Sequence, residues 1–344
     1  MEAVDVHGRF MWHQLLTRDM ARARSFYSKL VGWKAQPWPL DPAFTIWSMG
    51  DAPTAGLMEM TPEVPAEAPS HWLQYIGTRD VDGTAEAAVR AGGSILKPPS
   101  DMKGAGRYAV LRDPQGAVFA IIDPENARPE PAGNPPPLGT FSWHELATSD
   151  NEAAFAFYSS LFGWDAITRM DMGENVGVYL IFGQNGVQKG GMYIKAANMT
   201  MPPNWTPYAH VPSVDEAAKF IKANGGTIWQ EPMEVPGGSR IAIFCDPTGA
   251  ACAVHSYPAT AVAAAAEQPK PKAAAKVKAK PKARTKPKPK PKPKMKPKAK
   301  VKSRARPKAK AKARRKVKAK AKAKAKVRKK SPAKARAKSA RRKK

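Results

Sequence analysis

The chain has 344 residues, and its 58 Lys and Arg against 28 Asp and Glu give a formal net charge of +30. With only two cysteines, it is not a disulfide-stabilised secreted scaffold. The N-terminus has no basic segment followed by an apolar core, and no run of about 18 apolar residues occurs, so we expect a cytoplasmic protein without a secretory signal or membrane span.

The first predicted elements are a short apolar strand at residues 10–16 and a helix that Asp19 can cap. Ala23, Phe26 and Tyr27 recur at helical spacing and predict one buried helix face, and Gly32 ends the helix. Strands at 44–49 and 55–60 follow and complete the first half of the unit. The second half repeats the plan, with a strand at 72–77, a helix at 82–91, and strands at 107–112 and 117–122.

The whole unit then occurs a second time. The segment FMWHQLLTRD at residues 10–19 reappears as FSWHELATSD at residues 141–150, and the turn DPQGA at 113–117 reappears as DPTGA at 246–250. Matches of this length in the same order indicate an internal duplication. We therefore predict domains at residues 8–125 and 139–258, joined by a Pro-rich linker at residues 126–138.

The motif order, WHxLxTxD, a helix with FY, then GW, and a second half ending in DPxGA, resembles the vicinal oxygen chelate superfamily. Its members include glyoxalase I, extradiol dioxygenases and bleomycin-resistance proteins. The resemblance implies an α+β fold with two tandem domains, each made of two βαβββ modules that form a half-open barrel around a ligand cavity. It also implies that the tandem domains can act as a pseudo-dimer. It does not imply one reaction, because the fold hosts many chemistries.

In the metal enzymes of this superfamily, ligands come from the first strand of each module and from the strand after the DPxG turn. The corresponding residues are His13, Gln74 and Ala120 in the first unit, and His144, Pro207 and Ala253 in the second. The position of the expected Glu ligand is therefore Ala in both units. Because a catalytic divalent metal usually needs about three protein ligands, we expect no metal and no other cofactor.

The remaining polar candidates suggest a small-molecule site. His255 lies two residues after Ala253 and is expected on the same strand face, whereas Glu145 is expected on the face opposite His144. A neutral imidazole beside a cavity can act as a general base, and the alternative is a hydrogen-bonded residue of an apolar pocket. Core packing is the alternative for the aromatic candidates. The candidate catalytic residues are His13, His144 and His255, and the candidate ligand-binding residues are His13, Trp47, Gln74, His144, Tyr179 and His255.

The last part of the chain is a polycation. Residues 270–344 contain 39 of the 58 Lys and Arg and no acidic or aromatic residue, which leaves 19 basic against 28 acidic residues before them. A segment with so little apolar surface cannot offset the entropy cost of ordering, so we expect a disordered tail at residues 259–344. Its composition resembles the C-terminal tails of linker histones and bacterial histone-like proteins.

Such a tail binds polyanions with little regard for their sequence. DNA is the expected partner, and RNA, polyphosphate and acidic membrane surfaces are competitors. The candidate nucleic-acid contacts are Lys286, Lys288, Lys290, Lys292, Lys308, Arg314, Arg315, Arg328, Arg341 and Arg342.

These features together predict a glyoxalase-like small-molecule-binding protein without the usual metal site, tethered to DNA and associated with the nucleoid. One alternative is a lyase-, isomerase- or dioxygenase-type enzyme of the superfamily. The other is a nucleoid-associated architectural protein whose folded part spaces the tails.

Overall fold

A computed structural model describes residues 4–62, 64, 67–129, 135–173, 177–199 and 201–261. The chain divides into two units, Met1–Ala274 and Ala275–Lys344, and every described residue belongs to the first. Part of the predicted linker and all the tail contacts from Lys286 to Arg342 therefore lie outside the described residues. None of the described helices is both long and apolar enough to cross a lipid bilayer.

The first repeat contains two modules, each with one strand, one helix and three further strands. Their elements are β1 (Phe10–Thr17), α1 (Met20–Leu30), β2 (Lys34–Trp38), β3 (Asp41–Met49), β4 (Ala52–Glu59), β5 (His71–Gly77), α2 (Val81–Arg90), β6 (Ser94–Met102), β7 (Gly106–Arg112) and β8 (Val118–Pro124). Strands β2 and β6 are absent from the sequence-based prediction. Both are exposed edge strands that contain Pro, so they lack the apolar alternation that marks a buried strand.

The second repeat has the same element order. Its elements are β9 (Phe141–Thr148), α3 (Asn151–Phe162), β10 (Asp165–Asp171), β11 (Val178–Gln184), β12 (Val187–Ile194), β13 (Asn204–His210), α4 (Val214–Ala223), β14 (Thr227–Val235), β15 (Ser239–Cys245) and β16 (Ala251–Ser256). The α+β fold with two tandem domains of βαβββ modules is thus confirmed.

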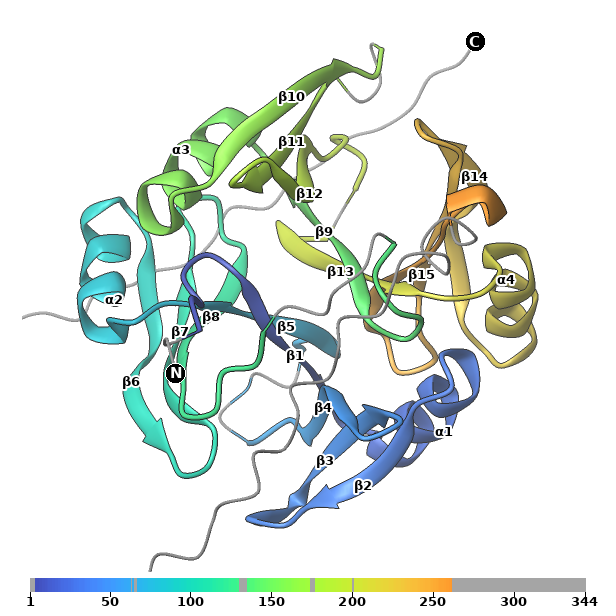
Figure 1. Ribbon diagram of the computed structural model, residues 1–344, viewed down its shortest axis with the longest axis horizontal. Coiled ribbons are helices and arrows are strands. Elements are labelled where there is room, and N and C mark those ends of the chain that lie inside the picture. Colours follow the sequence, from blue (N-terminus) through green and yellow to red (C-terminus); the bar gives the residue numbers. More distant parts are fainter. Residues whose placement is uncertain are drawn as a thin grey trace, which may run out of the picture. The chain divides into compact units, whose positions relative to one another are not determined.

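Each repeat forms one eight-stranded sheet that curls into a half-open barrel (Figure 1). The strand orders are β2-β3-β4-β1-β5-β8-β7-β6 and β10-β11-β12-β9-β13-β16-β15-β14. The first strands of the two modules, β1 and β5 or β9 and β13, pair antiparallel at the centre of each sheet. Residues on these central strands therefore lie at the deepest point of the curl.

The helices begin where the sequence predicts. Asp19, Asp80 and Asp150 each accept a hydrogen bond of 2.9 Å from a backbone N–H of the first helical turn. These bonds satisfy donors that have no partner inside the helix. At the other end of α3, Gly163 takes the left-handed conformation with φ 64°, which a residue without Cβ adopts at little cost.

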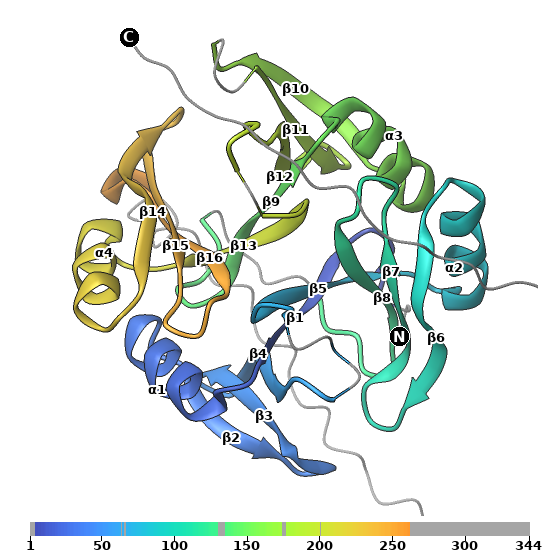
Figure 2. The same cartoon turned by 180° about the vertical axis from the view of Figure 1, so that it is seen from behind.

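The helix-bearing faces of the two sheets pack against each other. One core combines the first module of repeat one with the second module of repeat two, and the other core combines the two remaining modules. Helix α1 consequently lies beside α4, and α2 lies beside α3, in both views (Figures 1 and 2). The apolar helix faces are buried only because both repeats are present. We call this contact between the two repeats the seam.

Candidate functional site

A histidine pair lies at the centre of the seam. His13 Nε2 is 2.9 Å from His144 Nε2, and both side chains are buried. The Phe10 ring stacks on His144 with ring centroids 3.6 Å apart, and the Phe141 ring stacks on His13 at 3.9 Å. His144 Nδ1 is 3.1 Å from the Lys189 carbonyl, which can only accept, so Nδ1 of His144 carries its proton. His13 Nε2–H therefore donates to His144 Nε2.

We expect this pair to make the stability of the fold depend on pH. Burial lowers the pKa of His144 to about 3, with a smaller effect from the Lys189 charge. Burial and the neighbouring His144 also lower the pKa of His13 well below its usual value. Because unfolded histidines take up protons near pH 6.5, the stability that the neutral pair provides is present above that pH. It is lost progressively as the pH falls towards 3.

We expect the melting temperature of the wild-type protein to fall by roughly 5–10 °C between pH 7 and pH 4. A His13→Leu/His144→Leu variant, in which nothing at this point titrates, should lose a large part of that decrease. Scanning calorimetry across this range tests the expectation. Equal pH dependence in the two proteins would mean that other groups, such as the carboxylates, dominate acid unfolding.

The motifs shared by the two copies form two matching hydrogen-bond networks across the seam. The Tyr27 hydroxyl donates to Asp246 Oδ2 at 2.9 Å, and Trp72 Nε1 donates to Tyr27 at 3.0 Å. In the other half, Tyr158 donates to Asp113 at 3.1 Å. The FY and DPxG motifs therefore hold the two repeats together, and this accounts for their presence in both copies.

Strand register places the expected ligand positions on two different faces. His13 pairs with Gln74, and both side chains point into the seam. Ala120 instead pairs with Tyr75, which pairs with Trp12, so these three residues lie on the concave face opposite the helices. Paired residues share a sheet face and neighbours along a strand do not. The sequence-based assignment of His13, Gln74 and Ala120 to one cavity is therefore corrected.

The second repeat shows the same separation. Pro207 pairs with His144 on the seam face, whereas Trp143, Tyr208 and Ala253 line up on the concave face. His255 does share its face with Ala253, as its spacing predicts, and it pairs with His210. Glu145 lies on the strand face opposite His144, as its position in the sequence predicts, and its side chain points into this concave face.

The concave face of the first sheet is filled with apolar side chains. Leu16, Leu73 and Tyr75 form a buried cluster with residues from β7 and β8. Within it, the Tyr75 hydroxyl donates to Gln14 Oε1 at 2.9 Å, and Gln14 Nε2 lies 3.6 Å from Met58 Sδ. This face carries a neutral amide at the centre of the curl and is packed like a core.

The concave face of the second sheet carries a buried carboxyl group at the equivalent point. Glu145 is 7% exposed, and its two oxygens accept hydrogen bonds of 2.8 Å from the hydroxyls of Tyr179 and Tyr208. Trp143 Nε1 donates to the Tyr179 hydroxyl at 3.0 Å. A Cβ atom at Gly191 would collide with the Tyr179 ring. The glycine thus lets this ring cross β12 and reach the carboxyl group.

The pKa values of Glu145 and of its two tyrosine partners are all raised. Burial raises the pKa of the Glu145 carboxyl, while the hydrogen bonds from Tyr179 and Tyr208 act in the opposite direction. Burial and the Glu145 charge raise the pKa of both tyrosines well above 10, so both remain donors. Among the described residues, Glu145 forms no ion pair with Lys or Arg. A buried carboxyl with a raised pKa holds its proton more firmly than an exposed one, and such groups are candidates for proton exchange with a ligand.

The other sequence-based candidates are spread over both faces. Trp47 is fully buried in the seam core, next to Trp33 and Trp72. His255 lies at one end of the second concave face, where its Nδ1 is 2.9 Å from Ser142 Oγ. Burial, reinforced by His210, lowers the pKa of His255 to about 4, so its imidazole is neutral at pH 7. The structure thus brings His255 and Tyr179 to the concave face and leaves His13, Gln74 and His144 in the seam.

Comparison with known proteins agrees with this architecture. A family model described as Glyoxalase/Bleomycin resistance protein/Dioxygenase superfamily matches residues 9–121 and 140–254. The chain belongs to this superfamily. The match spans both repeats, and the vicinal oxygen chelate resemblance of the sequence is thereby confirmed.

The chain matches two relatives over most of their length. It is 30% identical over 247 residues to "Putative glyoxylase CFP32" of Mycobacterium tuberculosis, covering 70% of this chain and 91% of that protein. It is 28% identical over 274 residues to the anthracycline biosynthesis protein DauV of a Streptomyces species, covering 74% and 96%.

Among solved structures, the trihydroxybiphenyl dioxygenase of Sphingomonas wittichii has a TM-score of 0.53 at 12% identity, covering 73% of this chain and 90% of that one. The Mn(II)-bound glyoxalase of Novosphingobium aromaticivorans has a TM-score of 0.50 at 16% identity, covering 73% and 82%. At these identities the likeness concerns the fold.

The glyoxalase of Novosphingobium aromaticivorans contains Mn(II), and the residues of both concave faces here differ from what such a metal needs. No group of three His, Cys, Asp or Glu side chains that could hold a metal occurs among the described residues. Beside Ala120, across the central strands, lie Tyr75 and Trp12. Beside Ala253 lie Tyr208 and Trp143. These side chains do not fit the ligand set of a catalytic divalent metal.

Proposed function

We propose that the second repeat binds a small organic molecule on its concave face, with Glu145 as the polar anchor. The observation that carries this proposal is the difference between the two concave faces. The first is packed with apolar side chains around a neutral Gln14, whereas the second holds a buried carboxyl group and hydroxyl donors. A buried carboxyl costs stability, so its presence in only one copy supports a role in binding.

The surroundings of Glu145 suit a planar ligand. Trp143, Tyr179 and Tyr193 are half-buried, so their rings are available beside the buried carboxyl. Aromatic faces bury large areas of a ligand, and a few polar groups then fix its orientation. The relatives, named as a glyoxylase and as an anthracycline biosynthesis protein, also support small-molecule chemistry.

The same proposal includes binding without a resident metal. Elemental analysis of protein purified without a chelator should find less than one divalent metal per chain, and treatment with EDTA should leave ligand affinity unchanged. Stoichiometric metal that is lost together with ligand binding would contradict this part of the proposal.

A thermal-shift screen of planar aromatic compounds against the full-length protein tests the site. For compounds that stabilise the wild type, Glu145→Gln should weaken binding by roughly 10–100-fold, because it removes a charged hydrogen-bond partner and keeps the shape. Met58→Leu, a change of similar volume on the first concave face, should leave affinity unchanged. Equal affinities for wild type and Glu145→Gln would remove Glu145 from the site.

A second candidate function is a lyase or isomerase activity in which Glu145 moves a proton. The raised pKa of its carboxyl favours this reading. If Glu145 is the base, the rate should rise with pH through the pKa of this group and level off above it. Turnover of a bound compound, lost in Glu145→Gln, would support the enzyme over a binding protein.

We further propose that the basic tail tethers the protein to DNA or another polyanion and associates it with the nucleoid. The proposal rests on the charge of residues 270–344. A purely architectural role is the alternative, and it requires that no small molecule stabilises the folded repeats.

A further inference from the structure

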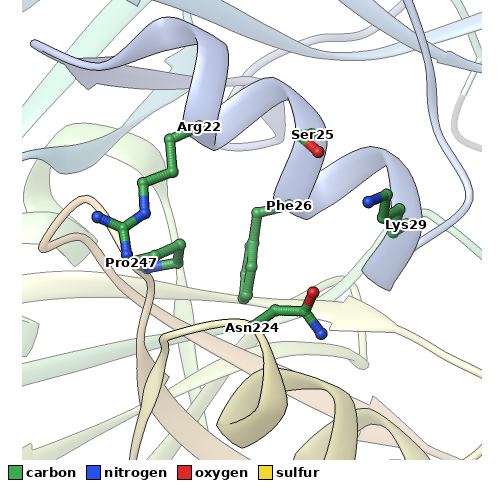
Figure 3. A pocket seen from close by; sticks show the side chains of 6 residues that line it. All are labelled: Arg22, Ser25, Phe26, Lys29, Asn224 and Pro247. Carbon is green, nitrogen blue, oxygen red and sulfur yellow. The ribbon is translucent and has the colours of Figure 1, made fainter.

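A hollow of about 260 Å³ opens on the seam, away from both concave faces. Four of its lining residues come from α1, and the other two come from the end of α4 and the DPTG turn of the second repeat. They are Arg22, Ser25, Phe26, Lys29, Asn224 and Pro247 (Figure 3). Phe26 forms the buried floor, with Arg22 and Lys29 on opposite sides of it (Figure 3).

The two cations of this hollow are unpaired within the described part of the chain. Neither the Arg22 guanidinium nor the Lys29 ammonium has an ion pair or a side-chain hydrogen bond there. Other surface cations of the second repeat do have acidic partners, for example Lys222 with Glu231 at 2.7 Å. Helix α1 itself contains no acidic residue. Positive charge is therefore concentrated here, on a body that is acidic before residue 270.

Packing alone does not require these charges. The duplication provides an equivalent helix contact elsewhere in the seam, between α3 and α2, and there Phe157 takes the place of Phe26. The residues at the other lining positions are Ala153, Ala156, Ser160, Ala91 and Pro114. At these positions the contact between α2 and α3 thus carries only uncharged side chains, so Arg22 and Lys29 are specific to one side of the pseudo-symmetric body.

The spacing of the charges indicates the class of ligand. Arg22 and Lys29 are seven residues apart, about 10 Å along the helix axis, so a single small anion does not match both. Asn224 donates one of its two amide N–H groups to the Phe220 carbonyl at 2.8 Å, so the side-chain donors that remain are the two cations, the Ser25 hydroxyl and the second Asn224 N–H. Guanidinium and ammonium groups bind phosphate oxygens well. We infer that this hollow binds a ligand with at least two linked phosphates, either a small diphosphate or neighbouring phosphates of a nucleic acid.

Sodium pyrophosphate and a short DNA duplex are the probes. The melting temperature of the full-length protein is measured with each probe and in sulfate at matched ionic strength. Binding across the seam stabilises the folded state by mass action, so we expect a rise of roughly 5 °C at a hundredfold excess over Kd. Arg22→Ala/Lys29→Ala should abolish the rise. Lys219→Ala/Lys222→Ala, with the same charge change on α4, should retain it.

The tail is identical in all these proteins, so differences between them report on the hollow. A rise with pyrophosphate alone identifies a small diphosphate ligand, and a rise with the duplex assigns the hollow to nucleic-acid phosphates. No rise in the wild type, or an equal rise in Arg22→Ala/Lys29→Ala, overturns the inference and indicates that the two cations only stabilise the helix ends.

Discussion

Truncation after Val262 is expected to abolish tight binding to duplex DNA. The removed segment contains all 39 basic residues of the tail, and the remaining body has an excess of acidic residues. If the tail engages about 6–10 phosphates, the affinity of the full-length protein should fall about 10³–10⁵-fold between 50 and 200 mM salt. Gel-shift titrations of both proteins over this salt range provide the measurement.

The truncated protein should show a salt dependence close to that of one or two phosphate contacts. Its circular dichroism spectrum and melting temperature serve as the control that the two repeats remain folded. DNA affinity and salt dependence that survive truncation would mean that the folded body, and not the tail, is the nucleic-acid-binding part.

Asp246→Ala is expected to lower the free energy of unfolding by about 3–5 kcal/mol. Asp246 is 3% exposed, and besides Tyr27 it accepts hydrogen bonds from the backbone N–H of Thr248 at 2.7 Å and of Ala250 at 3.1 Å. The substitution leaves these donors, which are buried or half-buried, without their acceptor. Urea denaturation of the full-length protein measures the loss.

Asp215→Ala is the matched control for this experiment. Asp215 lies in the same repeat, but its side chain is 51% exposed and paired with Arg240 at the surface. Such pairs contribute about 1 kcal/mol or less, so the control should unfold close to the wild type. Equal destabilisation by the two substitutions would show that the Tyr27–Asp246 contact does not hold the seam together.

The helices and central strands were predictable because their signals are local. Asp19 and Asp150 cap helices from the position next to them, and the apolar stripes of α1 and α3 have helical spacing. Strands β2 and β6 were not predictable, because edge strands bury little and show no alternation. The order of the motifs was enough to show the family resemblance. The FY and DPxG motifs occur in both repeats because they form the hydrogen bonds across the seam.

The candidate site was less predictable, and Glu145 shows why. Along β9 every residue from His144 to Thr148 is buried, because one strand face packs in the seam and the other lines the barrel. The usual alternation of apolar and polar residues is absent from a strand that is buried on both faces. An error of one residue in assigning the faces then exchanges them. His13 and His144 have the residue type of a ligand, yet they point into the seam, whereas Glu145 points into the barrel.

The sequence by itself determined the duplication, the α+β superfamily fold and the separation of an acidic body from a basic tail. These follow from repeats, local propensities and charge, which need no knowledge of distant contacts. Only the tertiary structure decided which strand face is concave, that Tyr179 and Tyr208 meet at Glu145, and that Arg22 faces the end of α4. Each of these depends on strand register or on contact between the repeats, and residues far apart in the chain set that geometry together.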